Sequence, residues 1–338
     1  MLQQKAFEQL NGFCKNVKRF ERVRRIALKK IGIVGGGCYG TALAECFSRI
    51  SEKVVVVEKN SQIVDSVNRN HENLVSLPKV VLSENIVYTD DESCLRDSEV
   101  IFLAVPANFV KQTCEYVKDS AIPLVLCSKG FDLENKRLLS DSVEGYLSNE
   151  IFVLSGPSFA AEISVNLPAK VNLAGKNFAK CVELSKKLSS KNFKIEPIED
   201  VIGLQVAGAL KNVLAIGCGI LLGKNLGQSA AARFMVEGVQ EMTKIAESFG
   251  GRAETFTKVG ALGDVILTCS SLQSRNMSFG KFLADRGSLQ AWNGPLAEGV
   301  FSAKFILNLS CSTKIFMKIY QVIYGLISVE EFIESVFE

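Results

Sequence analysis

The sequence predicts a doubly wound α/β domain followed by an all-helical C-terminal domain. From Ile31 to Ile198, short runs rich in Val and Ile alternate with amphipathic segments. That pattern is typical of βαβ units that build a parallel sheet covered on both faces. Beyond residues 196–200 no strand-like run interrupts the long periodic segments, so we expect only helices there.

Each element is expected where one of these runs lies. Strands are predicted at residues 31–34, 54–58, 86–89, 100–106, 123–128, 151–157, 171–175 and 193–198. One helix is predicted between the last two strands, at 178–190, and the helical domain is expected at 201–222, 228–249, 276–286, 300–309 and 313–324. The boundary lies near Pro197, so the predicted parts are a basic N-terminal extension (1–29), the α/β domain (30–198) and the helical domain (199–338).

Composition favours an enzyme or binding protein that acts on small molecules. The chain has 338 residues, 47% of them hydrophobic, and a formal net charge of only +3, so neither nucleic acid nor an anionic membrane is the expected partner. The basic segment 1–29 contains Glu8 and Glu21, which transit peptides usually avoid, and we interpret it as an exposed extension. Ten cysteines without a CxxC pair or zinc-ligand spacing predict reduced thiols, a cytoplasmic protein and no metal site.

The apolar stretch 201–223 is the segment that most resembles a membrane span. It is interrupted by Gln205, Lys211 and Asn212, whereas a span needs about 20 mainly apolar residues. We therefore expect a helix buried inside the protein and no membrane insertion.

A glycine-rich turn follows the first predicted strand. Gly35, Gly37 and Gly40 form G-x-G-x-x-G at the start of an Ala-rich helix. In a Rossmann-type domain, the first glycine permits a tight turn, the second lets backbone approach a pyrophosphate, and the third permits close packing of helix and strand. Because strand, turn, helix and second strand occur in order, we predict that this turn binds a dinucleotide.

Three further residues follow the carboxyl ends of predicted strands, where open α/β sheets bind ligands. Glu58 lies 18 residues after the last glycine, where an acid accepts the ribose 2′-hydroxyl and repels a 2′-phosphate, so we predict NAD, with NADP as the alternative because Lys59 is adjacent. Pro106 and Lys129 also overlook the crevice, and Lys129 would place a cation near the nicotinamide.

Lys211 and Asn212 interrupt a helix that is otherwise small or aliphatic on every side. A lysine is almost never fully buried without a partner or a task, although its stem can pack while its amine reaches solvent. The only histidine, His71, lies in a polar stretch that we interpret as a loop. Since histidine is the commonest acid or base near neutral pH, Lys211 becomes the candidate for proton transfer.

A second polar set occurs in the stretch 259–283. Asp264 and Thr268 are spaced i, i+4 on one helical turn, and Ser274, Arg275 and Asn276 follow in a predicted loop before the next helix. An arginine fork together with Asn and a helix N-terminus can hold a phosphate, although Arg275 could also be an ordinary surface charge.

From about Lys30 to Gly325 the chain resembles NAD(P)-dependent glycerol-3-phosphate dehydrogenases. Eight segments occur in order: GGGCYGTA, NRNHENLVSLP, AVP, SKG, SGPSFAAE, GALKNVLAIGCG, GALGDVILTCSSLQSRN and AEG. The resemblance implies reversible reduction of dihydroxyacetone phosphate to sn-glycerol 3-phosphate, a precursor for glycerophospholipid synthesis. It also implies a homodimer formed through the helical domain.

The resemblance also implies roles for individual residues. Lys211 would give and take the proton, with Asp264 orienting it. The dinucleotide would contact Cys38, Tyr39, Ala160 and Glu298, and Lys129 would serve both cofactor and substrate. Gly156, Ser158, Asp264, Ser274, Arg275 and Asn276 would surround the substrate, with Arg275 on its phosphate and near the cofactor; Asn212 and Thr268 complete the predicted substrate site.

The chain departs from the family pattern at several positions. Leu222, Ser229 and Glu237 stand where the family usually has an acidic residue, an Asn and an Arg, and Tyr39 replaces the usual Trp. These changes bear on the helical domain's surface and its oligomer packing more than on the proposed proton path.

Two alternatives remain at this stage. One is a ketopantoate- or 3-hydroxyacid-type reductase of the same architecture, which the Arg275–Asn276 phosphate clamp disfavours. The other is a non-catalytic dinucleotide-binding relative, which the presence of Lys129, Lys211 and Asp264 disfavours.

Overall fold

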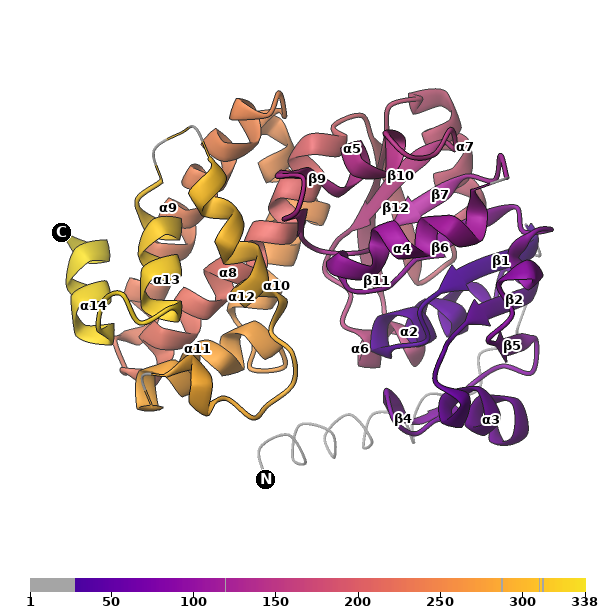
Figure 1. Cartoon of the computed structure of the whole chain (residues 1–338), viewed down its shortest axis with the longest axis horizontal. Coiled ribbons are helices and arrows are strands. Elements are labelled where there is room, and N and C mark those ends of the chain that lie inside the picture. The colour runs from indigo at the N-terminus through magenta and orange to yellow at the C-terminus, as the bar shows by residue number, and fades with distance from the viewer. Residues whose placement is uncertain (1–27, 119, 287, 310, 312) are drawn as a thin grey trace.

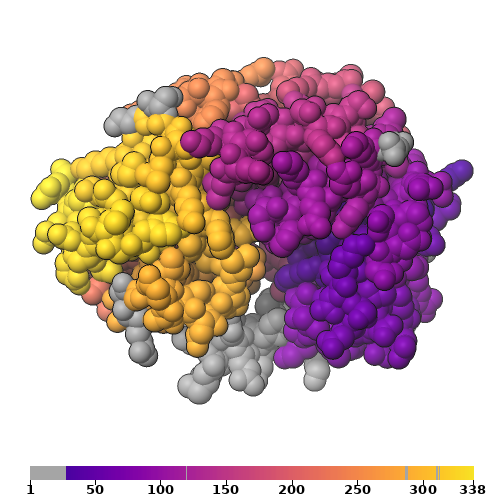
Figure 2. Space-filling model, in the orientation of Figure 1, coloured from indigo at the N-terminus to yellow at the C-terminus, as the bar shows by residue number. Residues whose placement is uncertain are grey.

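A computed structural model of the chain describes residues 28–338 except 119, 287, 310 and 312. An α/β part, drawn from indigo to magenta, lies beside a helical part drawn in orange and yellow (Figure 1). The two parts meet along the middle of the molecule (Figure 2). Most of the predicted extension, residues 1–27, lies outside the described residues, and the first strand begins at Leu28.

The strands occupy all eight predicted runs and two additional hairpins. In chain order they are β1 (Leu28–Val34), β2 (Ser51–Val57), β3 (Glu72–Asn73), β4 (Leu77–Val81), β5 (Ile86–Thr89), β6 (Val100–Leu103), β7 (Leu124–Leu126), β8 (Phe131–Asp132), β9 (Arg137–Leu138), β10 (Ile151–Ser155), β11 (Ala169–Gly175) and β12 (Phe193–Ile198).

The helices confirm a helical C-terminal part. They are α2 (Cys38–Phe47), α3 (Ser61–Asn70), α4 (Val110–Cys114), α5 (Leu139–Glu144), α6 (Ala160–Ser164), α7 (Phe178–Leu188), α8 (Val201–Gly223), α9 (Gly227–Ser248), α10 (Asp264–Cys269), α11 (Arg275–Arg286), α12 (Glu298–Ala303), α13 (Ile315–Ile323) and α14 (Val329–Phe337). From residue 199 onward the described residues contain no strand. Helix α14 was not predicted, although the capping box between Ser328 and Glu331 with which it begins is a usable sequence signal.

Eight strands form one sheet in the order β12-β11-β10-β7-β6-β1-β2-β5. Strands β5, β2, β1, β6, β7 and β10 are parallel neighbours in the order 3-2-1-4-5-6, which is the doubly wound dinucleotide-binding arrangement. The change of direction in strand order falls between β1 and β6, next to the glycine turn. This is where such sheets bind their ligands.

The expectation that β11 and β12 extend the sheet as parallel strands is wrong. Strand β11 pairs antiparallel with β10, and β12 runs parallel to β11. The connection from β10 to β11 contains only the five-residue helix α6, so it brings the chain back beside β10 without the crossover that parallel neighbours need. The reversal pairs Ser155 with Asn172.

Both faces of the sheet are apolar, which explains the continuous apolar runs. Alternate residues such as Ile33 and Phe102 face one core, covered by α2, α3 and α7. Their neighbours, such as Val34 and Leu103, face a second core covered by α4, α5 and the start of α8. The strands are therefore fixed between two layers of helices, and their carboxyl ends form a rigid edge.

Helix α8 is the axis of the helical part. It contacts α9, α10, α11, α12 and α13 and is buried on all sides from Gly203 to Leu221. Within the described part of the chain it is the one helix long and apolar enough to cross a membrane, yet 89% of that window is buried inside the protein. It therefore has the character of a core helix, as predicted.

Candidate active site

The glycine turn has the geometry that each glycine predicts. Gly35 has φ +101°, which L side chains rarely adopt, and a Cβ on Gly40 would lie 1.9 Å from the Gly35 oxygen. By contrast, a Cβ on Gly37 would meet nothing within 4 Å. Gly37 precedes α2 as its N-cap, without a side-chain cap and with no acidic residue in the first turn. The turn therefore offers open space and unpaired N–H groups to an anion.

Buried polar side chains of Asn73, Thr41 and Tyr88 hold this turn in place through hydrogen bonds. Asn73 Nδ2 donates to the Gly36 oxygen at 2.8 Å and to Thr41 Oγ1 at 2.9 Å, and Thr41 also bonds to Tyr88 Oη at 2.8 Å. Asn73 belongs to the NRNHENLVSLP stretch, which was interpreted as a loop. Instead, the stretch ends α3 and forms the β3–β4 hairpin. Its polar character reflects this supporting role.

Glu58 lies at the end of β2 beside the turn. Its carboxylate accepts from Gly36 N at 2.8 Å and from Asn60 N at 2.8 Å. Lys59 points elsewhere, because its amine bonds to Glu92 at 3.0 Å and to the Asp90 oxygen at 2.9 Å. The carboxylate, and not the neighbouring ammonium, therefore borders the turn.

Lys211, Asp264 and Thr268 form a buried cluster between α8 and α10. Lys211 Nζ lies 2.5 Å from Asp264 Oδ1 and 3.1 Å from Thr268 Oγ1. The side chains of Lys211 and Asp264 are only 11% and 3% exposed. The alternative in which the Lys211 amine extends to bulk solvent therefore does not hold. An ammonium held in this way can hand a proton to an oxygen placed beside it.

Lys129 and Glu298 complete the charged surroundings of this cluster. Burial lowers the pKa of Lys129 to about 8, while the negative charge of Asp264 acts against that fall and the positive charge of Lys211 adds to it. The Lys129 amine donates to the Leu154 oxygen at 2.9 Å. Burial also raises the pKa of Glu298, against the positive charges of Arg275, Lys211 and Lys129. Five charged side chains from both parts of the protein thus meet here.

Arg275 lies in the first turn of α11 and is exposed. Burial raises the pKa of the Cys38 thiol, and the positive charge of Arg275 lowers it, so the guanidinium lies within electrostatic reach of the glycine turn. Ser274 precedes the helix and accepts from Met277 N at 3.3 Å. The predicted loop therefore ends at Ser274, and Arg275 and Asn276 belong to the helix N-terminus, which favours an anion.

Asn212 and Asn276 are bonded to each other. Asn276 Nδ2 donates to Asn212 Oδ1 at 3.0 Å, and Asn276 Oδ1 accepts from Gly299 N at 2.8 Å. Both side chains are buried. These amides tie α8, α11 and α12 together and so fix the positions of Arg275 and Glu298.

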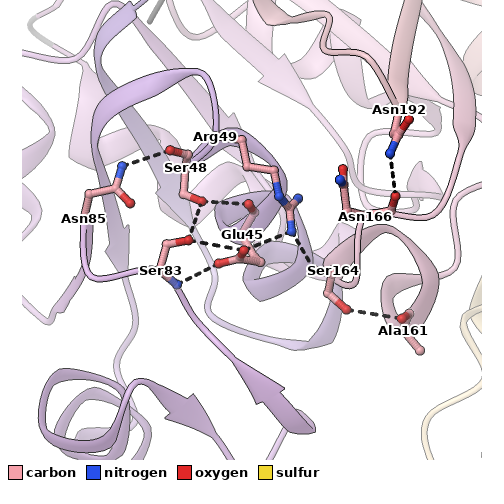
Figure 3. A network of polar contacts seen from close by, with 9 residues as sticks. All are labelled: Glu45, Ser48, Arg49, Ser83, Asn85, Ala161, Ser164, Asn166 and Asn192. Atoms are coloured by element: carbon pink, nitrogen blue, oxygen red, sulfur yellow. Dashed lines mark hydrogen bonds and ion pairs between the residues drawn. The ribbon is translucent and has the colours of Figure 1, made fainter. Parts of the chain in front are cut away.

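The loop after β10 carries Gly156 and Ser158 and leads into α6 at Ala160, and Tyr39 of α2 and Arg49, which follows α2, contact the two ends of this region. At its start, Tyr39 Oη lies 3.1 Å from Ser158 Oγ, which donates to the Gly156 oxygen at 2.9 Å. Past its end, Arg49 Nη2 bonds to the Ser164 oxygen at 2.8 Å and to Glu45 at 2.9 Å (Figure 3). Ser83 N donates to the buried Glu45 carboxylate at 2.7 Å (Figure 3). The loop is therefore fixed relative to the glycine turn.

A cavity of about 520 Å³ adjoins the cluster of charges. Pro106, Lys129 and Glu298 line it together with apolar side chains of α4, α5 and α12. Phe109 and Leu296, each 47% exposed, also line it. Phe109 was not singled out from the sequence, although it follows the carboxyl end of β6, where ligands bind in open α/β sheets.

Other candidates lie apart from this set. His71 caps the end of α3 with φ 53° and accepts from Leu82 N through its backbone oxygen. Leu222 and Ser229 are exposed, and Glu237 pairs with Arg233 at 2.7 Å on α9. Within the described ranges no group of three or more His, Cys, Asp or Glu side chains could hold a metal ion. Every described cysteine is a free thiol.

Comparison with known proteins identifies both parts of the chain. Residues 30–181 match the sequence model of the NAD-dependent glycerol-3-phosphate dehydrogenase N-terminus, and residues 200–334 match that of the C-terminus. A protein of Caulobacter vibrioides named glycerol-3-phosphate dehydrogenase (NAD(P)+) is 38% identical over 292 residues, which are 84% of this chain and 88% of the relative. The protein of that name from Ehrlichia canis is 37% identical over 88% of this chain and 95% of its own length.

A solved structure is similar over nearly the whole chain. The crystal structure of glycerol-3-phosphate dehydrogenase from Coxiella burnetii superposes with a TM-score of 0.87 at 29% sequence identity. The match covers 92% of this chain and 99% of that one.

Proposed function

The chain belongs to the NAD-dependent glycerol-3-phosphate dehydrogenase family, and from this we propose that it reversibly reduces dihydroxyacetone phosphate to sn-glycerol 3-phosphate with the residues described above. The observation that carries the proposal is the buried Lys211 ammonium, held by Asp264 and Thr268 beside Lys129 and Glu298. It supplies a proton donor in a chain whose one histidine caps the end of α3.

The residues around the glycine turn fit an NAD(P) dinucleotide. The open space at Gly37 and the N-terminus of α2 suit its pyrophosphate, and Glu58 suits the ribose 2′-hydroxyl of NAD. We propose that Gly35, Gly37, Cys38, Tyr39, Gly40, Glu58, Pro106, Lys129, Ala160, Arg275 and Glu298 hold it. When bound in its reduced form, the cofactor supplies the hydride for C2 of the ketone.

Arg275 would hold the phosphate of the substrate. Its exposed guanidinium lies in the first turn of α11, where backbone N–H groups and the helix dipole also attract an anion. Ser274, Asn212 and Asn276 fix that helix start, while Lys129, Gly156 and Ser158 would border the triose. Holding the phosphate also orients the carbonyl, and orientation of that kind can supply several of the roughly 7–11 kcal/mol available from positioning.

Lys211 would neutralise the oxygen on which negative charge develops. Its ammonium donates a proton to that oxygen during reduction and takes it back during oxidation. Asp264 and Thr268 fix the direction of the ammonium, because they accept two of its three hydrogens. The third hydrogen is then available to the substrate.

We also propose that the protein is a homodimer and works in the cytoplasm. Support for a dimer comes from exposed apolar side chains at the end of α8 and on α9, namely Leu222, Leu226 and Val236. Light scattering on the purified protein measures its mass in solution. The free cysteines support a reducing compartment, which cell fractionation tests.

The direct test is NADH oxidation followed at 340 nm. Adding dihydroxyacetone phosphate should start a decline in absorbance that neither ketopantoate nor a 3-oxoacid produces. No decline with the phosphate ester but oxidation with one of the other ketones would favour the reductase alternative. No turnover with any of them, despite NADH binding, would favour a non-catalytic relative.

A further inference from the structure

Two buried polar residues on neighbouring strands contact the segment that carries Asp264. Ser155 ends β10, and Asn172 is its cross-strand partner on the reversed strand β11. Ser155 Oγ donates to Asp264 Oδ2 at 3.4 Å, and Asn172 Oδ1 accepts from Gly260 N at 2.6 Å. Their exposures are 1% and 0%. The sheet therefore holds both ends of the segment from Gly260 to Asp264.

The segment itself departs from regular helix. Residues Val259–Gly263 (η5) form a single π-helical stretch that passes directly into α10 at Asp264. Such stretches leave backbone groups without regular partners and are frequent at functional sites. A Cβ on Gly260 would lie 2.6 Å from Asn172 Oδ1 and 2.8 Å from the Ser155 oxygen. The turn is thus pressed against the sheet, and Asn172 provides the acceptor that keeps it there.

We propose that Asn172 and Ser155 are positioning residues that set the place of the Asp264 carboxylate and, through it, the direction of the Lys211 ammonium. This inference rests on the proposed role of Lys211 as proton donor. Asn172 acts on the backbone before Asp264, and Ser155 acts on the carboxylate oxygen that Lys211 does not use. The hydrogen-bond partners of the ammonium itself are Asp264 and Thr268.

The same strand end also holds the second lysine of the site. The oxygen of Leu154, the residue before Ser155, accepts from Lys129 Nζ at 2.9 Å. Asn172 in turn is fixed because its Nδ2 donates to the Glu196 oxygen on β12 at 3.1 Å. Consecutive residues of β10 thus hold Lys129 and Asp264, and the neighbouring strands make this support rigid.

Asp264 is the charged side chain in direct contact with the Lys211 ammonium. Lys129 from the loop after β7 and Glu298 from α12 lie within electrostatic reach of it. Moving the Asp264 carboxylate should therefore turn the ammonium away from its productive direction, which should affect the chemical step more than the binding of substrate or cofactor.

The experiment compares Asn172→Leu and Ser155→Ala with the wild-type enzyme. For Asn172→Leu we expect kcat for dihydroxyacetone phosphate to fall about 10- to 100-fold, as expected for a small misplacement of a catalytic group, with little change in the Kd of NADH. Ser155→Ala should lower kcat about threefold, because it removes one long hydrogen bond. In both variants the loss should fall on kcat, with little change in the KM for dihydroxyacetone phosphate, because neither residue belongs to the proposed substrate site.

Asn149→Leu is the matched control. Asn149 is also a buried asparagine of the α/β part whose amide bonds backbone oxygens, but it precedes the opposite end of β10. The Asn149→Leu substitution should cost a comparable free energy of unfolding while leaving kcat unchanged. At low pH, Asn172→Asp should have a higher kcat than Asn172→Leu, because a protonated carboxyl can accept from Gly260 N and donate to the Glu196 oxygen.

A second readout does not depend on the substrate. In protein labelled with 13C at lysine Cε, the resonance absent from Lys211→Met identifies Lys211, and its chemical shift should change in Asn172→Leu but not in Asn149→Leu. If wild-type protein fails to reduce dihydroxyacetone phosphate yet this change occurs, the proposed function fails and the positioning inference stands. If Asn172→Leu loses stability like Asn149→Leu but keeps the wild-type kcat and the wild-type chemical shift of Lys211, the inference is overturned.

Discussion

Lys211 and Asp264 form an ion pair closed off from solvent, with 2.5 Å between Nζ and Oδ1. The two residues come from different helices, α8 and α10, and each is buried. A buried pair is weak evidence for stability, because desolvation of both charges offsets their attraction. Its position beside Lys129 and Glu298 points to chemistry as the reason it is present.

Lys211→Met should nearly abolish turnover. Loss of a general acid typically costs about 10²- to 10⁴-fold in rate, and the one histidine of the chain caps the end of α3 and not a helix that carries the cluster. NADH binding, measured by fluorescence titration, should change little because Lys211 lies outside the glycine turn. Retention of more than a few per cent of wild-type kcat would contradict the proton-transfer role.

The same variant should also be less stable. Removing Lys211 leaves the Asp264 carboxylate buried without its cation, which costs about 3–5 kcal/mol. The double variant Lys211→Met/Asp264→Asn removes the charge as well, so it should regain most of that free energy of unfolding and none of the activity. Urea denaturation measures the free energy of unfolding of the single and the double variant. Equal stability of the single and double variants would show that Asp264 is not a buried, ionised carboxylate in Lys211→Met.

Sequence patterns predicted the individual elements better than their directions. The apolar runs mark all eight strands of the main sheet because both faces are buried, and the apolar periodicity marks α8 as a core helix. Alternation of Val and Ile carries no strand direction, so the reversal of β11 was missed. Ser155 and Asn172 become neighbours only through that reversal, which is why they escaped notice as site residues.

The sequence predicted those residues of the candidate site whose type is rare at such a position without a functional role. A lysine inside an apolar helix and glycines after a strand are such cases, and the structure places Lys211 and Gly35 as those patterns imply. Asn172 was a lone polar residue in a buried strand, which is a usable signal that was not used. The tie between Asn212 and Asn276 depends on packing of α8 against α11, which one sequence does not encode locally.

Lys129 should give the enzyme an alkaline limit. Burial lowers its pKa to about 8, against the charge of Asp264, so the ammonium is lost as pH rises through that value in the free enzyme. The kcat/KM for dihydroxyacetone phosphate should therefore fall above about pH 8, and Lys129→Arg should move this decline upward because a guanidinium stays charged. An unchanged profile in Lys129→Arg would assign the limit to another group.

Arg275→Leu should weaken phosphate recognition selectively. Hydrogen bonds to a charged group are worth about 1.5–3 kcal/mol, so the KM for dihydroxyacetone phosphate should rise about 10- to 100-fold. Because Arg275 is also proposed to contact the cofactor, both enzymes are compared at saturating NADH, where variant and wild type should reduce unphosphorylated dihydroxyacetone alike. Arg233→Leu is the control, since Arg233 is an exposed arginine engaged with Glu237 on α9. A similar loss for both ketones in Arg275→Leu would refute a phosphate clamp.

Glu58→Gln should relax the preference for NADH over NADPH. The amide oxygen of Gln can still accept from Gly36 N, so the variant keeps its contact with the turn and removes the negative charge that would repel a 2′-phosphate. It also loses the bond from Asn60 N, because the amide nitrogen cannot accept. The ratio of kcat/KM for NADH to that for NADPH should fall about 10-fold or more, since the removed repulsion is worth over about 1.4 kcal/mol. Lys59→Met should leave the ratio near the wild-type value because Glu92 and the Asp90 oxygen already hold that amine. If Lys59→Met changed the ratio more than Glu58→Gln, the selectivity would belong to the lysine and the assignment of NAD to Glu58 would fail.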